Sequence, residues 1–246
     1  MKPDPIKAEL KSSFLRIQDG FLLAGTGLIV ALPHLYGQFY SMFPRLFSKP
    51  AGPERMQLLF IAELILYFFA LFLFILIGIL ANRRAGLTPF KSPGLRKIIY
   101  ASALGILLIP IGYLLYDHLV LALIPETYPR RLAFALAYPF SIAFPQELLN
   151  RFGLLSLLAW VFGKSRRKRI LANVLASVLL TAYAWADFYR LVDAPLSAIE
   201  IGFFLIGSLL LNLISNEIYL KNGFWAALAF KFGLTLKFPL YFFLFF

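Results

Sequence analysis

Long apolar stretches recur along the chain, and they constrain its fold more than any other feature. A helix needs about 20 mostly apolar residues to cross the hydrocarbon core of a bilayer. The stretches show no alternation of apolar and polar side chains with a period of two, so they do not predict a transmembrane β-barrel. They cover residues 21–40, 58–81, 98–124, 132–162, 170–188, 198–219 and 224–246. The sequence therefore predicts an all-α, polytopic transmembrane helical bundle with about seven spans.

The composition excludes most other classes of protein. Hydrophobic residues make up 61% of the chain and charged residues only 15%, whereas a soluble domain carries roughly 25% charged residues. A soluble enzyme, a disordered protein and a fibrous repeat are therefore excluded. The chain has no cysteine, which excludes disulfides, thiolate metal sites and a cysteine nucleophile.

The fourth stretch, residues 132–162, contains Pro139 and Pro145 and could cross the membrane once or twice. If it crosses once, most lysines and arginines lie on the side of the N-terminus. If it crosses twice, the basic loop 164–169 changes side and this asymmetry nearly vanishes. Basic loops face the cytoplasm, so we expect one crossing, a cytoplasmic N-terminus and a C-terminus on the opposite side. The prolines then indicate a broken or kinked helix.

The charge distribution also indicates the surroundings of the chain. The formal net charge is +12, and the basic residues fall in short runs between the apolar stretches. This pattern is typical of loops that face anionic lipid, so we expect membrane lipid and not nucleic acid as a partner. We expect two parts: a cytoplasmic N-terminal arm, residues 1–20, and one membrane-embedded domain, residues 21–246. The arm could be an amphipathic surface helix or a polar tail.

Five ionisable residues are candidates for membrane depth: Glu63, Glu147, Arg151, Lys231 and Lys237, whereas Asp187, Glu200 and Glu217 are expected near the interfaces. Each such group costs at least about 2.5–3.5 kcal/mol on insertion scales, so it normally faces the bundle interior and pairs. Glu147 and Arg151 are four residues apart on one helix face, which predicts an ion pair. The pair either holds the bundle together or belongs to a polar site. Glu63 has no partner in its own helix, and Lys231 is its candidate partner.

Polar uncharged residues are concentrated in the last three stretches. At this depth such side chains form interhelical hydrogen bonds more often than they bind ligands. These residues are Asn173, Ser177, Thr181, Asn212, Ser215, Asn216 and Thr235.

Three segments occur in the order of the motifs of one membrane-protein family. Residues 144–155, FPQELLNRFGLL, resemble the first motif of the CPBP family, the CAAX-protease and bacteriocin-processing (Abi) intramembrane proteases. That motif has two glutamates, three further residues, then arginine, commonly followed by glycine and leucine. Residues 172–180 resemble the start of the second motif, and residues 222–228 resemble the lead-in to the third. The resemblance covers residues 95–240 and implies residence in a cytoplasmic (inner) bacterial membrane.

The resemblance also implies which positions would carry catalysis. In the family the first glutamate activates water, and two histidines with an asparagine or aspartate complete the polar cluster. In this chain the base position is Gln146, whose amide cannot accept a proton near neutral pH. The histidine positions fall at Ala184, or Trp185 with a shift of one residue, and at Lys231. The last position is Thr235.

Only Glu147 and Arg151 match the family pattern, and the resemblance implies a structural role for both. The two histidines, His34 and His118, lie outside the aligned positions. A metal site needs about three or four converging ligands. A site built from Glu147, Glu63 and one displaced histidine is disfavoured, so we expect no metal and no cofactor.

Three functions remain open at this stage. The first is a catalytically inactive relative, a pseudoprotease, that binds a transmembrane peptide, a lipidated peptide or lipid, or serves as a subunit of a membrane complex. The second is an active intramembrane endopeptidase with Glu147 as base. The third is a transporter component whose intramembrane charges line a pathway. The replacement of every expected catalytic group favours the first.

Overall fold

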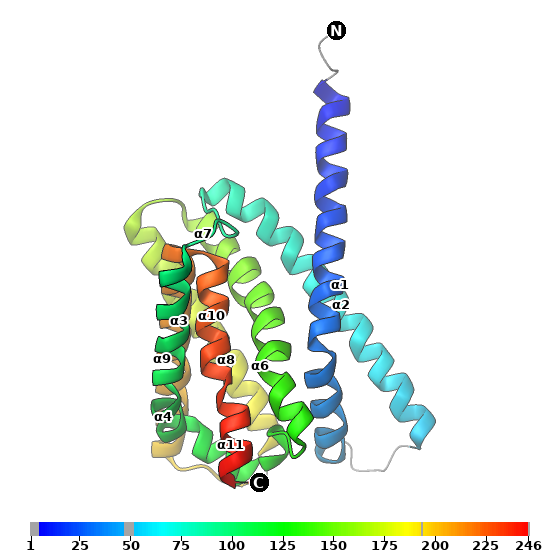
Figure 1. Ribbon diagram of the computed structural model, residues 1–246, viewed down its shortest axis with the longest axis vertical. Helices are drawn as coiled ribbons and strands as arrows, with labels where there is room; N and C mark the ends of the chain where they lie inside the picture. Colours follow the sequence, from blue (N-terminus) through cyan, green and yellow to red (C-terminus); the bar gives the residue numbers. More distant parts are fainter. Residues whose placement is uncertain (1–4, 47–51, 193, 246) are drawn as a thin grey trace.

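The computed structural model describes residues 5–46, 52–192 and 194–245, and these residues form helices and connecting turns with no strand. Seven helical stretches are long and apolar enough to cross a membrane, and Figure 1 shows them running up and down beside one another. This confirms the prediction of an all-α polytopic bundle. The seven stretches are Arg16–Met42, Pro53–Ala85, Leu95–Leu123, Leu132–Phe162, Arg166–Leu191, Ala198–Asn222 and Phe224–Phe245.

Three of the seven spans are assembled from shorter helical segments. The unbroken helices are α1 (Pro5–Leu46), α2 (Pro53–Ala85), α8 (Arg166–Leu191) and α9 (Ala198–Asn222). The third span consists of α3 (Leu95–Leu107), α4 (Ile109–Gly112), the π-helix η1 (Tyr113–Asp117) and α5 (His118–Leu123), and the 3₁₀ turn η2 (Pro125–Thr127) follows it. The fourth span consists of α6 (Leu132–Glu147), the π-helix η3 (Leu148–Leu155) and α7 (Ser156–Phe162). The last span consists of α10 (Phe224–Thr235) and α11 (Lys237–Phe245).

The fourth stretch forms a single candidate span, Leu132–Phe162, and its α-helix is interrupted, but not at a proline. α6 continues through both Pro139 and Pro145. The interruption is η3, which begins directly after Glu147. A π-helical segment adds a residue to the turn and changes the directions of the side chains that follow. The site described below lies at this change of helix type.

Local sequence signals explain where several helices start and stop. Ser197 and Glu200 form a capping box at the start of α9, and Ser165 caps α8 by accepting a hydrogen bond from the amide of Lys168. Such caps satisfy amides that have no partner within the helix. At the end of α2, Gly86 adopts a left-handed conformation with φ of 67°. Glycine takes this conformation without steric cost.

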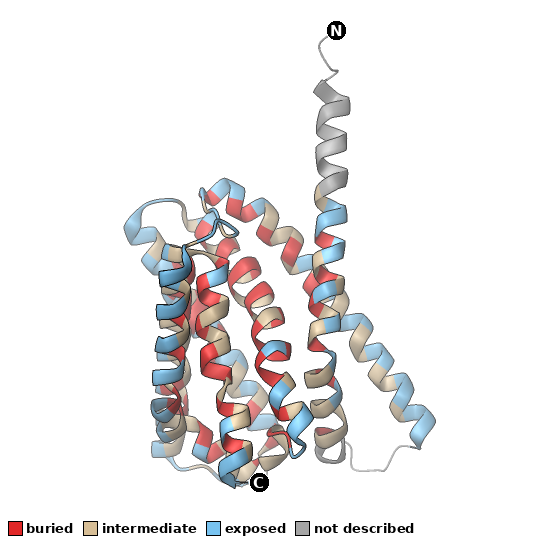
Figure 2. Cartoon of the chain, in the orientation of Figure 1, coloured by how far each residue is buried: buried red, intermediate tan, exposed pale blue. Residues whose placement is uncertain are grey.

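The described surface carries many exposed large apolar side chains, and charged side chains are buried among the apolar ones of the interior, unlike in a soluble protein. Leu66 is 71% exposed and Ile29 is 68% exposed, whereas Glu147 and Arg151 are buried. Figure 2 shows exposed positions along the outer faces of the spans and buried positions where the helices meet. Lipid tails solvate exposed apolar side chains, but they offer no hydrogen-bond partners to polar groups. The chain is therefore an integral membrane protein.

The predicted division at residue 20 has no counterpart in the backbone, because α1 is one continuous helix from Pro5 to Leu46. The cytoplasmic location of the arm stays a prediction.

Glycines allow a close helix contact between α3 and α10. A Cβ atom at Gly105 would overlap the backbone of Phe230, and a Cβ at Gly233 would overlap the backbone of Ser102. Small residues at such contacts let two helix backbones approach, which is how helices pack tightly in lipid. This contact fixes the last span, and therefore Lys231, relative to the third span.

We expect Gly233→Val to destabilise the protein, because its side chain would have to push α3 away from α10. Overpacking of this kind costs roughly 1–3 kcal/mol. The apparent midpoint of thermal unfolding in detergent should fall. The control is Gly202→Val in α9, where a Cβ atom meets nothing within 4 Å. Equal midpoints for the two variants would contradict the packing argument.

Candidate functional site

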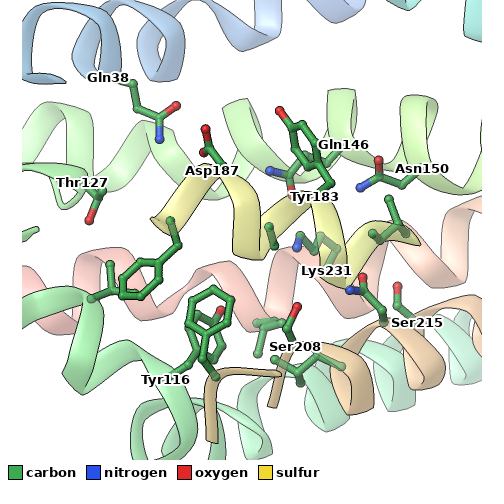
Figure 3. A pocket seen from close by; sticks show the side chains of 18 of the residues that line it. Gln38, Tyr116, Thr127, Gln146, Asn150, Tyr183, Asp187, Ser208, Ser215 and Lys231 are labelled. Carbon is green, nitrogen blue, oxygen red and sulfur yellow. The ribbon is translucent and has the colours of Figure 1, made fainter. Parts of the chain in front are cut away.

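A cavity of about 310 Å³ lies among the fourth to seventh spans, with residues of α1 and the third span at one side. Its inner end is polar and includes Arg151, Ser215 and Lys231. Its lining extends to Thr127 and Leu191, at the end of the bundle where Figure 1 places the C-terminus. Figure 3 shows the polar side chains of the lining in close view.

The cavity brings together positions that the family resemblance singles out. Gln146 on α6, Ala184 on α8 and Lys231 on α10 all line it, together with Arg151 on η3. Their separation in the sequence means that only the folded bundle can gather them. Trp185, the alternative to Ala184, is not among the lining residues, and its ring centroid lies 5.6 Å from that of Phe204.

Glu147 and Thr235 are not among the lining residues. The hydroxyl of Thr235 donates to backbone carbonyls, including that of Pro139 at 3.2 Å, and so ties α10 to α6. Glu147 is fully buried behind the cavity wall.

The structure contains the ion pair between Glu147 and Arg151. Oε1 of Glu147 lies 3.2 Å from Nη1 of Arg151, but neither carboxylate oxygen has a hydrogen-bond partner among the described residues. Arg151 donates from Nε to Asn216 and from Nη2 to Asn212, both at 3.1 Å. The guanidinium therefore joins the fourth span to α9 as well as neutralising Glu147. Its structural role stays a prediction.

The polar residues expected to connect helices do so between α8 and α9. Asn216 donates to the hydroxyl of Ser177 at 2.9 Å, and Asn212 donates to the hydroxyl of Thr181 at 3.4 Å. Ser177 donates in turn to the carbonyl of Asn173. Ser215 is the exception in this set, because its buried hydroxyl has no partner among the described residues.

The amine of Lys231 lies at the cavity wall, and no described carboxylate forms an ion pair with it. Its electrostatic neighbours are Arg151, Glu147, Lys237 and Asp117. Glu63 is not one of these neighbours, does not line the cavity, and forms no ion pair within the described ranges. The structure thus does not show the suggested pairing of Glu63 with Lys231.

Sequence reasoning missed a second buried ion pair, between Asp117 and Lys237. The ammonium of Lys237 donates to Asp117 and also to the hydroxyl of Tyr116 at 2.9 Å. Tyr128 and Tyr241 donate to the two carboxylate oxygens at 2.7 and 3.2 Å. The sequence signal that could have indicated this pair was an aspartate inside the third apolar stretch and a lysine inside the seventh.

A polar cluster on the other side of η3 was also missed. Ser156 and Tyr219 both donate to the side-chain oxygen of Asn82, at 3.0 and 3.1 Å. These bonds connect the second, fourth and sixth spans. Asn82 lies next to the basic residues at the end of α2, where a polar residue is expected to be exposed, so the sequence does not indicate that it is buried.

The described residues contain no cluster of three or more His, Cys, Asp or Glu side chains that could hold a metal. His34 packs edge-on against Tyr138, with ring centroids 5.1 Å apart. His118 lies 2.9 Å from the carbonyl of Tyr113, in a different part of the bundle.

The chemistry open to the cavity follows from its lining. Its inner end offers cations, amides and a hydroxyl. The carboxylate in the described lining is Asp187, which is held 3.0 Å from Arg190. Such a surface can donate hydrogen bonds and attract negative charge. It places no carboxylate beside Gln146 where a general base would stand.

Comparison with known proteins returned no match: no family model, no curated protein and no solved structure. The resemblance to the CPBP family therefore rests on the motifs quoted above.

The Asp117–Lys237 pair can be tested by a double-mutant cycle. Removing one partner of a buried pair leaves an uncompensated charge and costs roughly 3–5 kcal/mol. We expect Asp117→Asn and Lys237→Met each to lower the unfolding midpoint, and the double variant to lose less than the two losses combined. The matched control is Asp187→Asn with Arg190→Gln, an exposed pair of the kind worth only about 0–1 kcal/mol. Strict additivity at Asp117 and Lys237 would contradict the pairing.

Proposed function

We propose that this integral membrane protein binds a membrane-embedded ligand in the cavity and does not hydrolyse it. The ligand is a transmembrane or lipidated peptide, a lipid, or a segment of a partner subunit. The observation that carries the proposal is the shared cavity of Gln146, Ala184 and Lys231. In the family that the motifs resemble, these positions hold the water-activating glutamate and two histidines. On this proposal the chain is a CPBP-like pseudoprotease.

The chemistry of these side chains supports binding over hydrolysis. Hydrolysis needs a base that takes a proton from water and groups that stabilise the oxyanion. Gln146 cannot take the proton, and Ala184 has no polar group. The remaining side chains can still hold a polar part of a ligand in place.

Glu147 is a poor substitute for the missing base. Its carboxylate is fully buried, does not line the cavity and lies against Arg151. The contact is a single one at 3.2 Å, not a bidentate clamp. A base has to reach the attacking water within hydrogen-bond distance, so an endopeptidase that uses Glu147 would have to rearrange this wall.

A transporter is supported less well, because the cavity lining includes Lys231 but neither Glu63 nor Glu147. These intramembrane charges therefore do not line one common path in this conformation.

The binding function predicts no proteolysis. The purified full-length chain in nanodiscs, incubated with prenylated peptides and helical transmembrane substrates, should give no products above empty nanodiscs. Mass spectrometry of the reaction mixtures is the measurement. The comparison variants are Glu147→Gln and, as a control at an exposed position, Lys91→Gln. Cleavage that disappears in Glu147→Gln but persists in Lys91→Gln would end the proposal and establish the endopeptidase.

We propose further that the protein resides in a bacterial cytoplasmic membrane with its N-terminus inside. The motif resemblance supports the choice of membrane, and the basic loops at residues 83–97 and 164–169 support the orientation, because such loops remain cytoplasmic.

The absence of cysteine from the chain makes this orientation testable. Single cysteines at Lys164 and at Glu126 should react oppositely with a membrane-impermeant maleimide in intact spheroplasts. The cysteine at position 126 should be labelled from outside, and the one at position 164 only after lysis. The reverse pattern would invert the topology.

A further inference from the structure

The inner end of the cavity carries more positive than negative charge. Lys231 is coupled electrostatically to two cations, Arg151 and Lys237, and to two carboxylates, Glu147 and Asp117. Each carboxylate is held by a different cation, Arg151 or Lys237. Among these five groups, Lys231 is left as the ammonium without an ion-pair partner, and it lies on the cavity wall. A negatively charged ligand would therefore complement the charge of this wall.

Uncharged donors surround the same space. The hydroxyl of Ser215 is buried, lines the cavity and has no hydrogen-bond partner among the described residues. The side-chain amides of Gln146 and Asn150 also line it, and neither bonds to another described residue. Figure 3 shows Gln146, Asn150 and Lys231 facing the interior of the cavity. A buried polar group without a partner is rare in proteins and calls for an explanation.

The number and placement of these donors favour a phosphoryl group over a carboxylate. Lys231, Ser215 and Gln146 approach from three different spans. A carboxylate presents two oxygens in one plane, whereas a phosphoryl group presents three or more around a tetrahedral centre. Lysine binds phosphate as a point charge, and charge-assisted hydrogen bonds of this kind are the strong ones. A cation would meet Lys231 and Arg151 and be repelled.

The remaining walls suit the apolar part of a lipid. Leu180, Leu211 and Leu234 line the cavity between the polar groups. Tyr183 also lines it and is 73% exposed on α8, so the cavity reaches the outer surface of the bundle. A volume of about 310 Å³ is at the low end for ligand sites, which span about 300–1,000 Å³. It fits a head group, with the chains leaving toward the bilayer.

We propose that this cavity binds a phosphoryl group, carried by an anionic membrane lipid or supplied as free phosphate, with Lys231 as the charge partner and Ser215, Gln146 and Asn150 as hydrogen-bond donors. The inference rests on the proposed binding function and names the chemistry of its ligand.

Binding can be measured by isothermal titration of the full-length protein in a neutral detergent. The probes are dihexanoyl phosphatidic acid, inorganic phosphate and dihexanoylglycerol, which lacks phosphate. We expect phosphatidic acid to bind and dihexanoylglycerol to bind at least tenfold more weakly. Tight binding of inorganic phosphate would assign the site to the free anion. Binding that requires the acyl chains would assign it to lipid.

Variants connect the binding to the cavity. Lys231→Gln should weaken phosphatidic acid binding roughly tenfold or more, because one charge-assisted contact is lost. Lys231→Arg should retain it, Ser215→Ala should weaken it a few-fold, and Lys91→Gln, an exposed lysine on a loop, should leave it unchanged. Circular dichroism and size-exclusion chromatography check that each variant is folded. Because Ser215→Ala removes only a hydroxyl without a partner, it remains informative if Lys231→Gln does not fold.

Two outcomes would overturn the inference. One is that phosphatidic acid and phosphate bind no better than dihexanoylglycerol. The other is that folded Lys231→Gln and Ser215→Ala bind like Lys91→Gln. If the proposed function, binding without hydrolysis, is itself wrong, the separate nanodisc assay will show proteolysis. Binding of a helical peptide without any phosphate binding would leave the binding function standing and remove this ligand assignment.

Discussion

The guanidinium of Arg151 is the constraint around which the centre of the bundle is organised. Hydrocarbon offers it no hydrogen-bond partner, so the protein has to supply them all. Glu147 supplies charge from the same helix, and Asn212 and Asn216 supply oxygens from α9. Removing either asparagine leaves a buried donor unsatisfied, which costs more than the bond itself contributes, and removing Glu147 leaves the buried guanidinium charge uncompensated. The network therefore specifies how the fourth span meets α9, and with it the shape of the cavity.

The π-helical segment η3 gives this network its geometry. Arg151 lies inside η3 and Glu147 is the residue before it. The wider turn leaves the Glu147 carboxylate in the wall and Arg151 at the cavity, although the two residues are neighbours on one helix face. Glycine contacts between α3 and α10 act from the other side by fixing the register of the span that carries Lys231. The cavity thus depends on two local features: the π-helical turn of η3 and the close approach of α3 and α10 at their glycines.

The sequence predicted what depends on local spacing and missed what depends on distant contacts. The apolar stretches gave the number of spans, because hydrophobic length is a property of consecutive residues. The contact of Glu147 with Arg151 was predictable for the same reason, since residues four apart share a helix face. Asp117 and Lys237 are 120 residues apart, and no pattern in either stretch indicates the other. The convergence of Gln146, Ala184 and Lys231 was an expectation only through the order of the family motifs. Asn150 and Ser215 could not be assigned to the cavity without coordinates.

On the proposed pseudoprotease assignment, the residues at positions 146 and 231 do more than remove catalytic groups, because they also change the charge of the cavity. In that proposal, position 146 has lost a carboxylate and position 231 has exchanged an imidazole for an ammonium. Both changes make the electrostatic potential in the cavity more positive. Neutral residues at both positions would abolish hydrolysis equally well, but they would not leave an ammonium without an ion-pair partner inside a membrane protein, where each charge is costly. A charge kept at such a cost needs a compensating group. The described residues supply compensation for Arg151 and Lys237, so the partner of Lys231 is to be sought in what the cavity binds.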